Sequence, residues 1–154
     1  MVEYQIAHRS SREIRVGRAE ETVATFRPGR LIADLQGEAG SVSYKMKLPA
    51  PWRGFRYRLE QDGRELANAA KPKVRQRIVS FDVEMPGRKL QLVSQGELAL
   101  EWVLLEGGEE RARFTQRSFG EHDKWTADFR SREESVGLAA FVAWLVLQAR
   151  PYLA

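Results

Sequence analysis

The sequence predicts a mainly β fold with one helix, in which a closed antiparallel β-barrel of about 10–12 strands surrounds a hydrophobic C-terminal helix. Turn residues recur at intervals of roughly ten positions through residues 1–130. A run of uncharged residues then follows near the C-terminal end. We expect a single domain over residues 1–154, with strands in 1–130 and the central helix over 132–149.

The predicted turns are short runs rich in proline, glycine and aspartate. They are Pro28-Gly29, Gly37 to Gly40, Pro49-Ala50-Pro51, Asp62-Gly63, Pro86-Gly87, Gln95-Gly96, Gly107-Gly108 and Gly120. This spacing leaves room for strands but not for long helices. Asp62-Gly63 and Gly107-Gly108 tolerate the positive φ angles of tight hairpins, so we expect a hairpin at each.

Between the turns, apolar and polar residues often alternate, as they do in strands with one buried face. Two sets of alternating apolar residues are each expected to share the buried face of a strand: Val2, Tyr4 and Ile6, and Phe55, Tyr57 and Leu59. The charged residues between the second set would then face solvent.

The C-terminal segment has the composition of a helix without a polar side. Residues 136–147 are all apolar or glycine, and such a run spans more than three helical turns. Ser131 to Glu134 fits a capping box at the start of the helix, and Arg150-Pro151 supplies a cation and a stop at its end.

A helix of this kind requires apolar neighbours on all sides. Burying its large side chains would contribute roughly 12–24 kcal/mol before conformational entropy is subtracted. An eight-stranded barrel is filled by its own side chains, so more strands are needed to enclose a helix. The alternative is a membrane tail anchor, but about 20 apolar residues are needed to cross a bilayer. Extending the run towards that length brings in Gln148, Arg150 and the helix-ending Pro151, which weakens this alternative.

Three segments carry a resemblance to a known family: the hairpin from Tyr57 to Leu66, the segment around Trp125, and Glu134 to Leu147. In the order of its elements, nearly the whole chain resembles the tubby C-terminal-like superfamily, in particular the LURP-one-related proteins and the related phospholipid scramblases. The resemblance implies a twelve-stranded barrel around a hydrophobic C-terminal helix. It also implies binding of phosphoinositide-like headgroups through surface lysines and arginines, and it implies no catalytic residues.

A cluster of cations is the candidate site for an anionic ligand. Its residues are Arg56, Arg58, Lys71, Lys73, Arg75 and Arg77. The last four recur at every second position, so one strand would place them on a single face. Residues 53–77 hold eight basic and three acidic residues, an excess that attracts phosphates of lipids or nucleic acids. A solvated outer face that discourages edge pairing is the simpler explanation, and the sequence favours it.

Nucleic acid is the less favoured partner. Proteins that bind single strands usually stack bases on exposed aromatic side chains. The aromatic residues near the cations are Phe55, Tyr57 and Phe81, and their alternating positions place them in the expected core.

Enzymatic signatures are absent from the sequence. There is no GxSxG, P-loop or GxGxxG motif, and His8 and His122 have no metal-ligand spacing. The lack of cysteine excludes thiol nucleophiles, thiolate metal sites and disulfides. An acidic and histidine-containing cluster surrounds Trp125 and is best explained as a polar loop: Glu121, His122, Asp123 and Asp128. We expect no enzyme, no metal and no cofactor.

These observations lead to one functional hypothesis and one alternative. The net charge of +4 permits an anionic partner without requiring one. The N-terminus does not resemble a secretory signal, so we expect a cytoplasmic protein that is able to act at the periphery of a membrane. The hypothesis is a non-enzymatic binding or scaffold module for anionic membrane surfaces. The alternative is a small-molecule or lipid carrier whose barrel holds an internal cavity.

Overall fold

The computed structural model describes residues 2–9, 13–29, 34–96, 99–118, 122–130 and 134–152. Within these ranges the chain forms thirteen strands, one α-helix and two short 3-10 helices. The strands are β1 (Val2–Arg9), β2 (Glu13–Arg18), β3 (Glu21–Pro28), β4 (Leu35–Ala39), β5 (Val42–Lys47), β6 (Tyr57–Gln61), β7 (Arg64–Ala69), β8 (Lys73–Arg75), β9 (Ile78–Met85), β10 (Arg88–Gln95), β11 (Glu101–Glu106), β12 (Glu109–Ser118) and β13 (His122–Phe129). The helices are η1 (Pro51–Arg53), α1 (Val136–Gln148) and η2 (Arg150–Tyr152).

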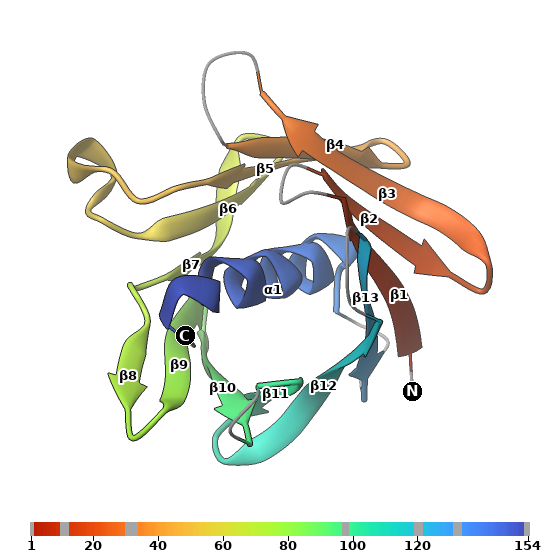
Figure 1. Ribbon diagram of the computed structural model, residues 1–154. Helices are drawn as coiled ribbons and strands as arrows, with labels where there is room; N and C mark the ends of the chain where they lie inside the picture. Colours follow the sequence, from red (N-terminus) through yellow and green to blue (C-terminus); the bar gives the residue numbers. More distant parts are fainter. Residues whose placement is uncertain are drawn as a thin grey trace.

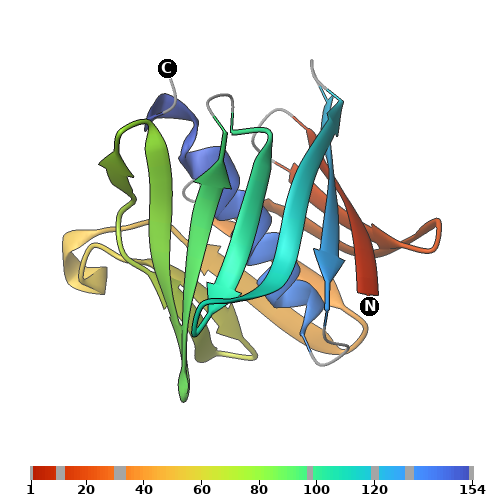
Figure 2. The same ribbon diagram turned by 90° about the horizontal axis from the view of Figure 1, so that it is seen from below.

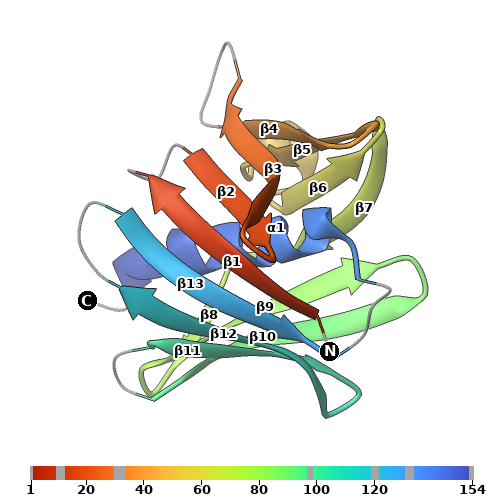
Figure 3. The same ribbon diagram turned by 90° about the vertical axis from the view of Figure 1, so that its right-hand side faces the viewer.

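Twelve of the strands close into an antiparallel barrel. Strands β1 to β7 pair in chain order, β7 pairs with β9, β9 to β13 again pair in order, and β13 returns to β1. The strands surround α1 on all sides in Figure 1, and Figures 2 and 3 show the same enclosure from two further directions. The predicted closed barrel with a central C-terminal helix is therefore confirmed.

Strand β8 is the one described strand that lies outside the ring. It pairs with the first half of β9, from Lys73 opposite Ser80 to Arg75 opposite Ile78. β7 pairs with the second half of the same edge, at only two residue pairs. The chain therefore leaves the barrel wall after β7, and β8 projects from it as a short flap (Figure 1).

Alternation along the strands decides which side chains face the interior. Val2, Tyr4 and Ile6 are buried, as the sequence predicts. In β6, Tyr57 is buried as expected, but Phe55 is 53% exposed, so the prediction for Phe55 is wrong. Phe55 precedes the strand and has a φ of 57°, so the alternation starts only at Tyr57.

The central helix is buried over almost its whole length. Every residue from 137 to 147 is buried, which leaves no side of α1 in contact with water. The Trp144 ring packs edge-on against Tyr57 of the barrel wall, with the ring centroids 5.6 Å apart. No helix among the described residues is long and apolar enough to span a membrane.

The helix begins at Val136, four residues later than predicted. Ser135 is the N-cap: its backbone is extended, and its hydroxyl accepts a hydrogen bond from the Leu138 amide at 3.1 Å. Glu134 lies before the helix rather than in its first turn. The rest of the predicted capping box, residues 131–133, lies outside the described residues.

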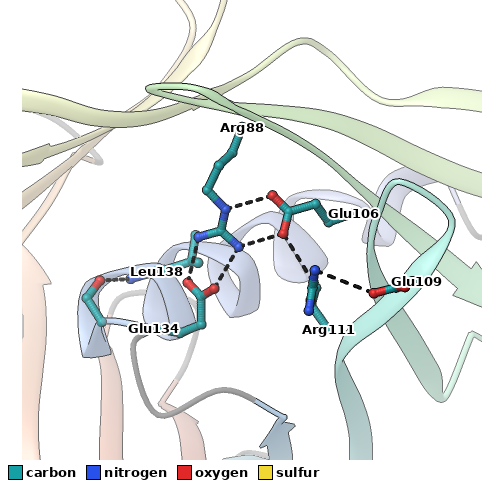
Figure 4. Close-up of polar contacts among 7 residues, drawn as sticks. Arg88, Glu106, Glu109, Arg111, Glu134 and Leu138 are labelled. Carbon is teal, nitrogen blue, oxygen red and sulfur yellow. Dashed lines mark hydrogen bonds and ion pairs between the residues drawn. The ribbon is translucent and has the colours of Figure 1, made fainter.

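Glu134 instead joins the start of the helix to the barrel rim through a network of charges (Figure 4). The Arg88 guanidinium donates to both carboxylate oxygens of Glu134, at 2.7 and 3.3 Å, and to both of Glu106, at 2.8 and 3.0 Å. Arg111 donates a further hydrogen bond to Glu106 at 3.1 Å. The hydrogen bonds to Glu106 and then to Glu134 raise the pKa of Arg88. This network ties together β10, β11 and the segment that leads into α1.

Both predicted hairpins are confirmed. Asp62-Gly63 joins β6 to β7, and Gly107-Gly108 joins β11 to β12, with positive φ at all four residues. The predicted turn over Gly37 to Gly40 is wrong at its start, because Gly37 lies within β4. A Cβ at Gly37 would lie 2.4 Å from the Thr25 carbonyl oxygen, so a close approach of backbones requires this glycine. The turn predicted at Gly120 lies outside the described residues.

Candidate functional site

The predicted basic cluster divides into two groups in the structure. Lys71, Lys73, Arg75 and Arg77 lie on the projecting flap and its flanks, and we call residues 71–77 the basic segment. One strand does not carry all four cations, because β8 contains only Lys73 and Arg75. Lys71 precedes the strand, and Arg77 lies in the hairpin turn with a φ of 67°. All four residues are exposed.

Three of these four cations have no acidic partner among the described residues. Lys73 forms an ion pair with Asp82 at 2.8 Å, and both side chains remain largely exposed. Lys71, Arg75 and Arg77 form no ion pair or hydrogen bond with any described side chain. Their charge is therefore available to an anionic ligand, and no described carboxylate neutralises it first.

Arg56 and Arg58 are engaged within the fold and are half-buried. Arg56 donates a hydrogen bond to Asn68 at 2.6 Å and lies 3.5 Å from Glu84. Arg58 pairs with Glu65 and donates twice to the Arg53 carbonyl oxygen, at 2.8 and 3.1 Å. These contacts give the two arginines a structural role, and they leave less of their charge available to a ligand than in the basic segment.

The loop over residues 50–55 presents two aromatic side chains to solvent. Trp52, in η1, is 77% exposed, and Phe55, just after η1, is 53% exposed. The Arg53 guanidinium lies 5.9 Å from the centre of the Trp52 ring. The Lys71 ammonium lies 5.4 Å from the centre of the Phe55 ring, within the range of a cation–π contact. This contact joins the loop, which we call the aromatic loop, to the basic segment.

The elements that carry the large exposed hydrophobic side chains of the described chain lie on one side of the barrel, with the loop between β5 and β6 at the upper left and β8 at the lower left of Figure 1. These side chains are Trp52, Phe55, Val74, Ile78 and Tyr152. They come from η1 and the residues just after it, from β8, from the start of β9 and from η2. Figures 1 and 2 both place η1, β8 and η2 on the left of the barrel. Apolar surface concentrated beside cations is typical of an interaction face.

The sequence reasoning missed these apolar residues. For the aromatic loop a signal existed, because Trp52 and Phe55 follow Pro49-Ala50-Pro51, and turn residues usually keep their neighbours near the surface. Val74 and Ile78 carry no comparable signal. Their exposure results from the departure of β8 from the barrel wall.

The buried histidine has the wrong properties for acid–base chemistry near neutral pH. His8 is 2% exposed, and neither ring nitrogen has a hydrogen-bond partner among the residues that the structure describes. Burial, and secondarily the Arg150 cation, lower the pKa of His8 to about 3. His8 therefore stays neutral inside the barrel.

The prediction of a polar loop around Trp125 is wrong, because His122, Asp123 and Asp128 lie in β13 and Glu121 lies outside the described residues. Of this cluster only Asp128 has a described side chain, and burial and a hydrogen bond with Glu3 raise the pKa of its carboxyl.

Two cavities on the outer surface lie away from the basic segment. One, of about 660 Å³, lies over β3, β4 and the start of β5 and is lined by Thr25, Arg27 and Glu38 among others. The other, of about 630 Å³, lies over β1, β2 and β13 beside Arg15, Lys124 and Thr126. Neither contains a predicted site residue. Over the ranges that the structure covers, no group of three or more His, Cys, Asp or Glu residues could hold a metal ion.

The chain matches no family model, and comparison with curated proteins and with solved structures finds no similar protein. Function therefore has to be inferred from the geometry of this chain.

Proposed function

We propose that this protein is a non-enzymatic binding module that docks on anionic phospholipid surfaces through the basic segment. The observation that carries the proposal is the exposure of Lys71, Arg75 and Arg77 without acidic partners among the described residues. Each lysine or arginine near an anionic bilayer contributes about 1 kcal/mol of attraction, which salt weakens. Lys73 adds a fourth cation, which Asp82 partly neutralises.

A lipid surface fits this face better than a nucleic acid does. Trp52 and Phe55 are exposed and could stack on bases. The sequence argument against nucleic acid therefore holds for Tyr57 and Phe81, which are buried, but not for Phe55. Val74 and Ile78 are also exposed beside the same cations. Aliphatic side chains offer no stacking surface to a base, whereas they do bury well among acyl chains.

The interior of the barrel argues against the carrier alternative. A carrier requires a cavity, but α1 occupies the centre of this barrel and its residues are buried on every side. The arrangement of twelve strands around a hydrophobic C-terminal helix supports the proposed kinship with the tubby C-terminal-like superfamily and the phospholipid scramblases. A cytoplasmic protein acting at the membrane periphery is part of the same proposal.

Vesicle co-sedimentation across a salt series tests the proposal. We expect the protein to bind phosphatidylcholine vesicles that contain about one third phosphatidylserine, and to bind pure phosphatidylcholine far more weakly. Raising the salt from about 0.05 to 0.5 M should release it. The double variant Arg75→Glu and Arg77→Glu should weaken binding at low salt by about 30-fold or more, since two attractive charges are lost.

A matched control changes the same amount of charge elsewhere. Arg18 and Lys124 are exposed residues of β2 and β13, strands that lie on the other side of the barrel from β8 in Figure 1. The double variant Arg18→Glu and Lys124→Glu should bind as the wild type does. An equal loss in both variants would mean that net charge, not this face, controls binding. Binding of a single-stranded oligonucleotide without binding of vesicles would overturn the proposal in favour of nucleic acid.

A further inference from the structure

The aromatic loop carries the two most exposed of the large hydrophobic side chains among the described residues. Trp52 has the largest exposed fraction among the large hydrophobic side chains, at 77%, and Phe55 follows at 53%. Neither side chain contributes to the core. Their apolar area is therefore available for a partner, and burying it would add binding free energy that does not depend on charge.

Interactions within the fold hold this loop in place. Arg53 forms an ion pair with Asp34 at 3.0 Å and donates a hydrogen bond to the Leu48 carbonyl at 3.2 Å. The amides of Arg53 and Phe55 both donate to the Ala50 carbonyl, at 2.9 and 3.0 Å, and Arg58 donates twice to the Arg53 carbonyl. The loop is tied on both sides, so the outward position of Trp52 is built into the fold.

Phe55 occupies a backbone conformation that disfavours its own side chain. Its φ of 57° lies in the left-handed region, where glycine is unstrained and a bulky residue is not. The preceding residue, Gly54, has a similar φ of 69° and is a glycine. Folding alone would therefore favour glycine at position 55. An exposed phenylalanine at a strained position indicates a role outside the core.

The two rings lie beside cations that suit a bilayer interface. Lys71 of the basic segment contacts the Phe55 ring, and Arg53 contacts the Trp52 ring. Aromatic rings flanked by lysine and arginine are typical of the boundary between headgroups and acyl chains, where rings sink in and cations stay with phosphates. Lys71 and the two rings together offer both interactions at one place, whereas the charge of Arg53 is engaged by Asp34.

We propose that Trp52 and Phe55 form an aromatic anchor that inserts into the interfacial region of an anionic bilayer. This inference rests on the proposed function and adds that binding has an apolar component, besides the electrostatic attraction of the basic segment. The anchor penetrates only to the level of the headgroup boundary, as amphipathic interfacial elements do.

Tryptophan fluorescence tests the insertion directly, because Trp52 is the one exposed tryptophan of the four. Trp102, Trp125 and Trp144 are each at most 4% exposed. On addition of phosphatidylserine-containing vesicles we expect the Trp52 emission to shift to shorter wavelength and to become shielded from acrylamide. Lipids brominated near the headgroup should quench it. The variant Trp52→Phe should show none of these changes while it still binds.

Affinity measurements on variants separate insertion from a structural role. Trp52→Ala and Phe55→Gly should each weaken vesicle binding about tenfold at moderate salt, whereas Trp52→Phe and Phe55→Leu should bind nearly as the wild type does. The salt dependence of the remaining binding should not change, because no charge is lost. Phe55→Gly should melt at the same temperature as the wild type or higher, since it relieves the backbone strain, so a loss of binding cannot be attributed to unfolding.

The outcomes of these experiments distinguish the anchor from the docking function. If the protein sediments with anionic vesicles but Trp52 stays fully accessible to acrylamide, the anchor is wrong and the electrostatic docking stands. If no anionic vesicle binds the protein at low salt, the docking function fails and the anchor fails with it. If Trp52→Ala binds as tightly as the wild type, the anchor is likewise overturned.

Discussion

The Arg88 guanidinium holds both carboxylate oxygens of Glu134, at 2.7 and 3.3 Å, across 46 positions of sequence. Glu134 has a side chain that is only 8% exposed, and it stands just before the N-cap of the central helix. Arg88 begins β10 on the barrel rim. The pair therefore fixes where the chain enters the barrel, and Figure 4 shows that Glu106 holds Arg88 from the other side.

Removal of the Glu134 charge should destabilise the fold. Glu134→Gln leaves Arg88 with one carboxylate instead of two, and we expect a loss of about 1–2 kcal/mol, because the pair is only partly shielded from solvent. Urea denaturation of Glu134→Gln, Arg88→Met and the double variant measures the coupling between the two residues. If the stability losses of the two single variants simply add in the double variant, the direct interaction between Arg88 and Glu134 contributes nothing to stability.

Gly137 provides a second test of how the helix fits the barrel. A Cβ at this position would lie 2.2 Å from a ring carbon of Tyr44, a buried residue of β5. Glycine to alanine within a helix normally stabilises by roughly 0.5–1 kcal/mol. Here the overlap should outweigh that gain and give a net loss of about 1–3 kcal/mol.

The Tyr44→Leu background serves as the control for Gly137→Ala. The smaller side chain should relieve the overlap, so the loss caused by Gly137→Ala in urea denaturation should shrink. A Gly137→Ala protein more stable than the wild type would show that the helix is not pressed against β5.

The overall architecture was accessible from sequence because its determinants are local. The period of two in β1 and the turn at Asp62-Gly63 identify strands from neighbouring residues alone. The apolar run from Val136 to Leu147 has no polar side, and this property alone requires a surrounding wall. Strand number and helix composition together were enough to predict the closed barrel.

The details that sequence did not give depend on contacts between distant segments. Gly37 resembled a turn residue, but its place in β4 reflects the approach of Thr25 from the next strand. Ser135, and not Ser131, caps the helix, and the Arg88–Glu134 pair fixes this entry point. No pattern among neighbouring residues in the sequence predicts either contact.

The candidate site was only partly predictable for the same reason. Arg56 and Arg58 have the same local appearance as Arg75 and Arg77 in the sequence. Only the structure shows that Arg58 donates hydrogen bonds to the Arg53 carbonyl and forms an ion pair with Glu65. The alternation that predicted a buried Phe55 failed because the strand starts two residues later, at Tyr57.

His8 should make the stability of the fold sensitive to acid. Burial lowers its folded-state pKa to about 3 from an ordinary value of 6.5. The unfolded chain therefore takes up the proton first as the pH falls, so the neutral histidine has its full stabilising effect above pH 6.5 and loses it progressively towards pH 3. The slope from this group approaches 1.4 kcal/mol per pH unit at most.

The variant His8→Leu isolates this effect. Its free energy of unfolding, measured by urea denaturation between these two pH values, should fall less steeply with acid than that of the wild type. Carboxylates titrate in both proteins, so their contribution cancels when the two free energies of unfolding are subtracted at each pH. Identical slopes would mean that His8 is hydrated or partnered in solution.

Deletion of the helix should abolish the domain and not merely weaken it. A chain ending at Arg130 loses the buried side chains of residues 137–147, and large apolar residues each contribute about 1.5–3 kcal/mol. Their sum exceeds the 5–15 kcal/mol net stability typical of a whole domain. The barrel would also be left with an empty apolar lumen, so we expect no cooperative thermal transition by circular dichroism or calorimetry. A chain ending at Tyr152 is the matched control and should melt as the full protein does. If the chain that ends at Arg130 still melted cooperatively, the barrel wall would be able to fold on its own and the helix would be an insertion into a preformed cavity.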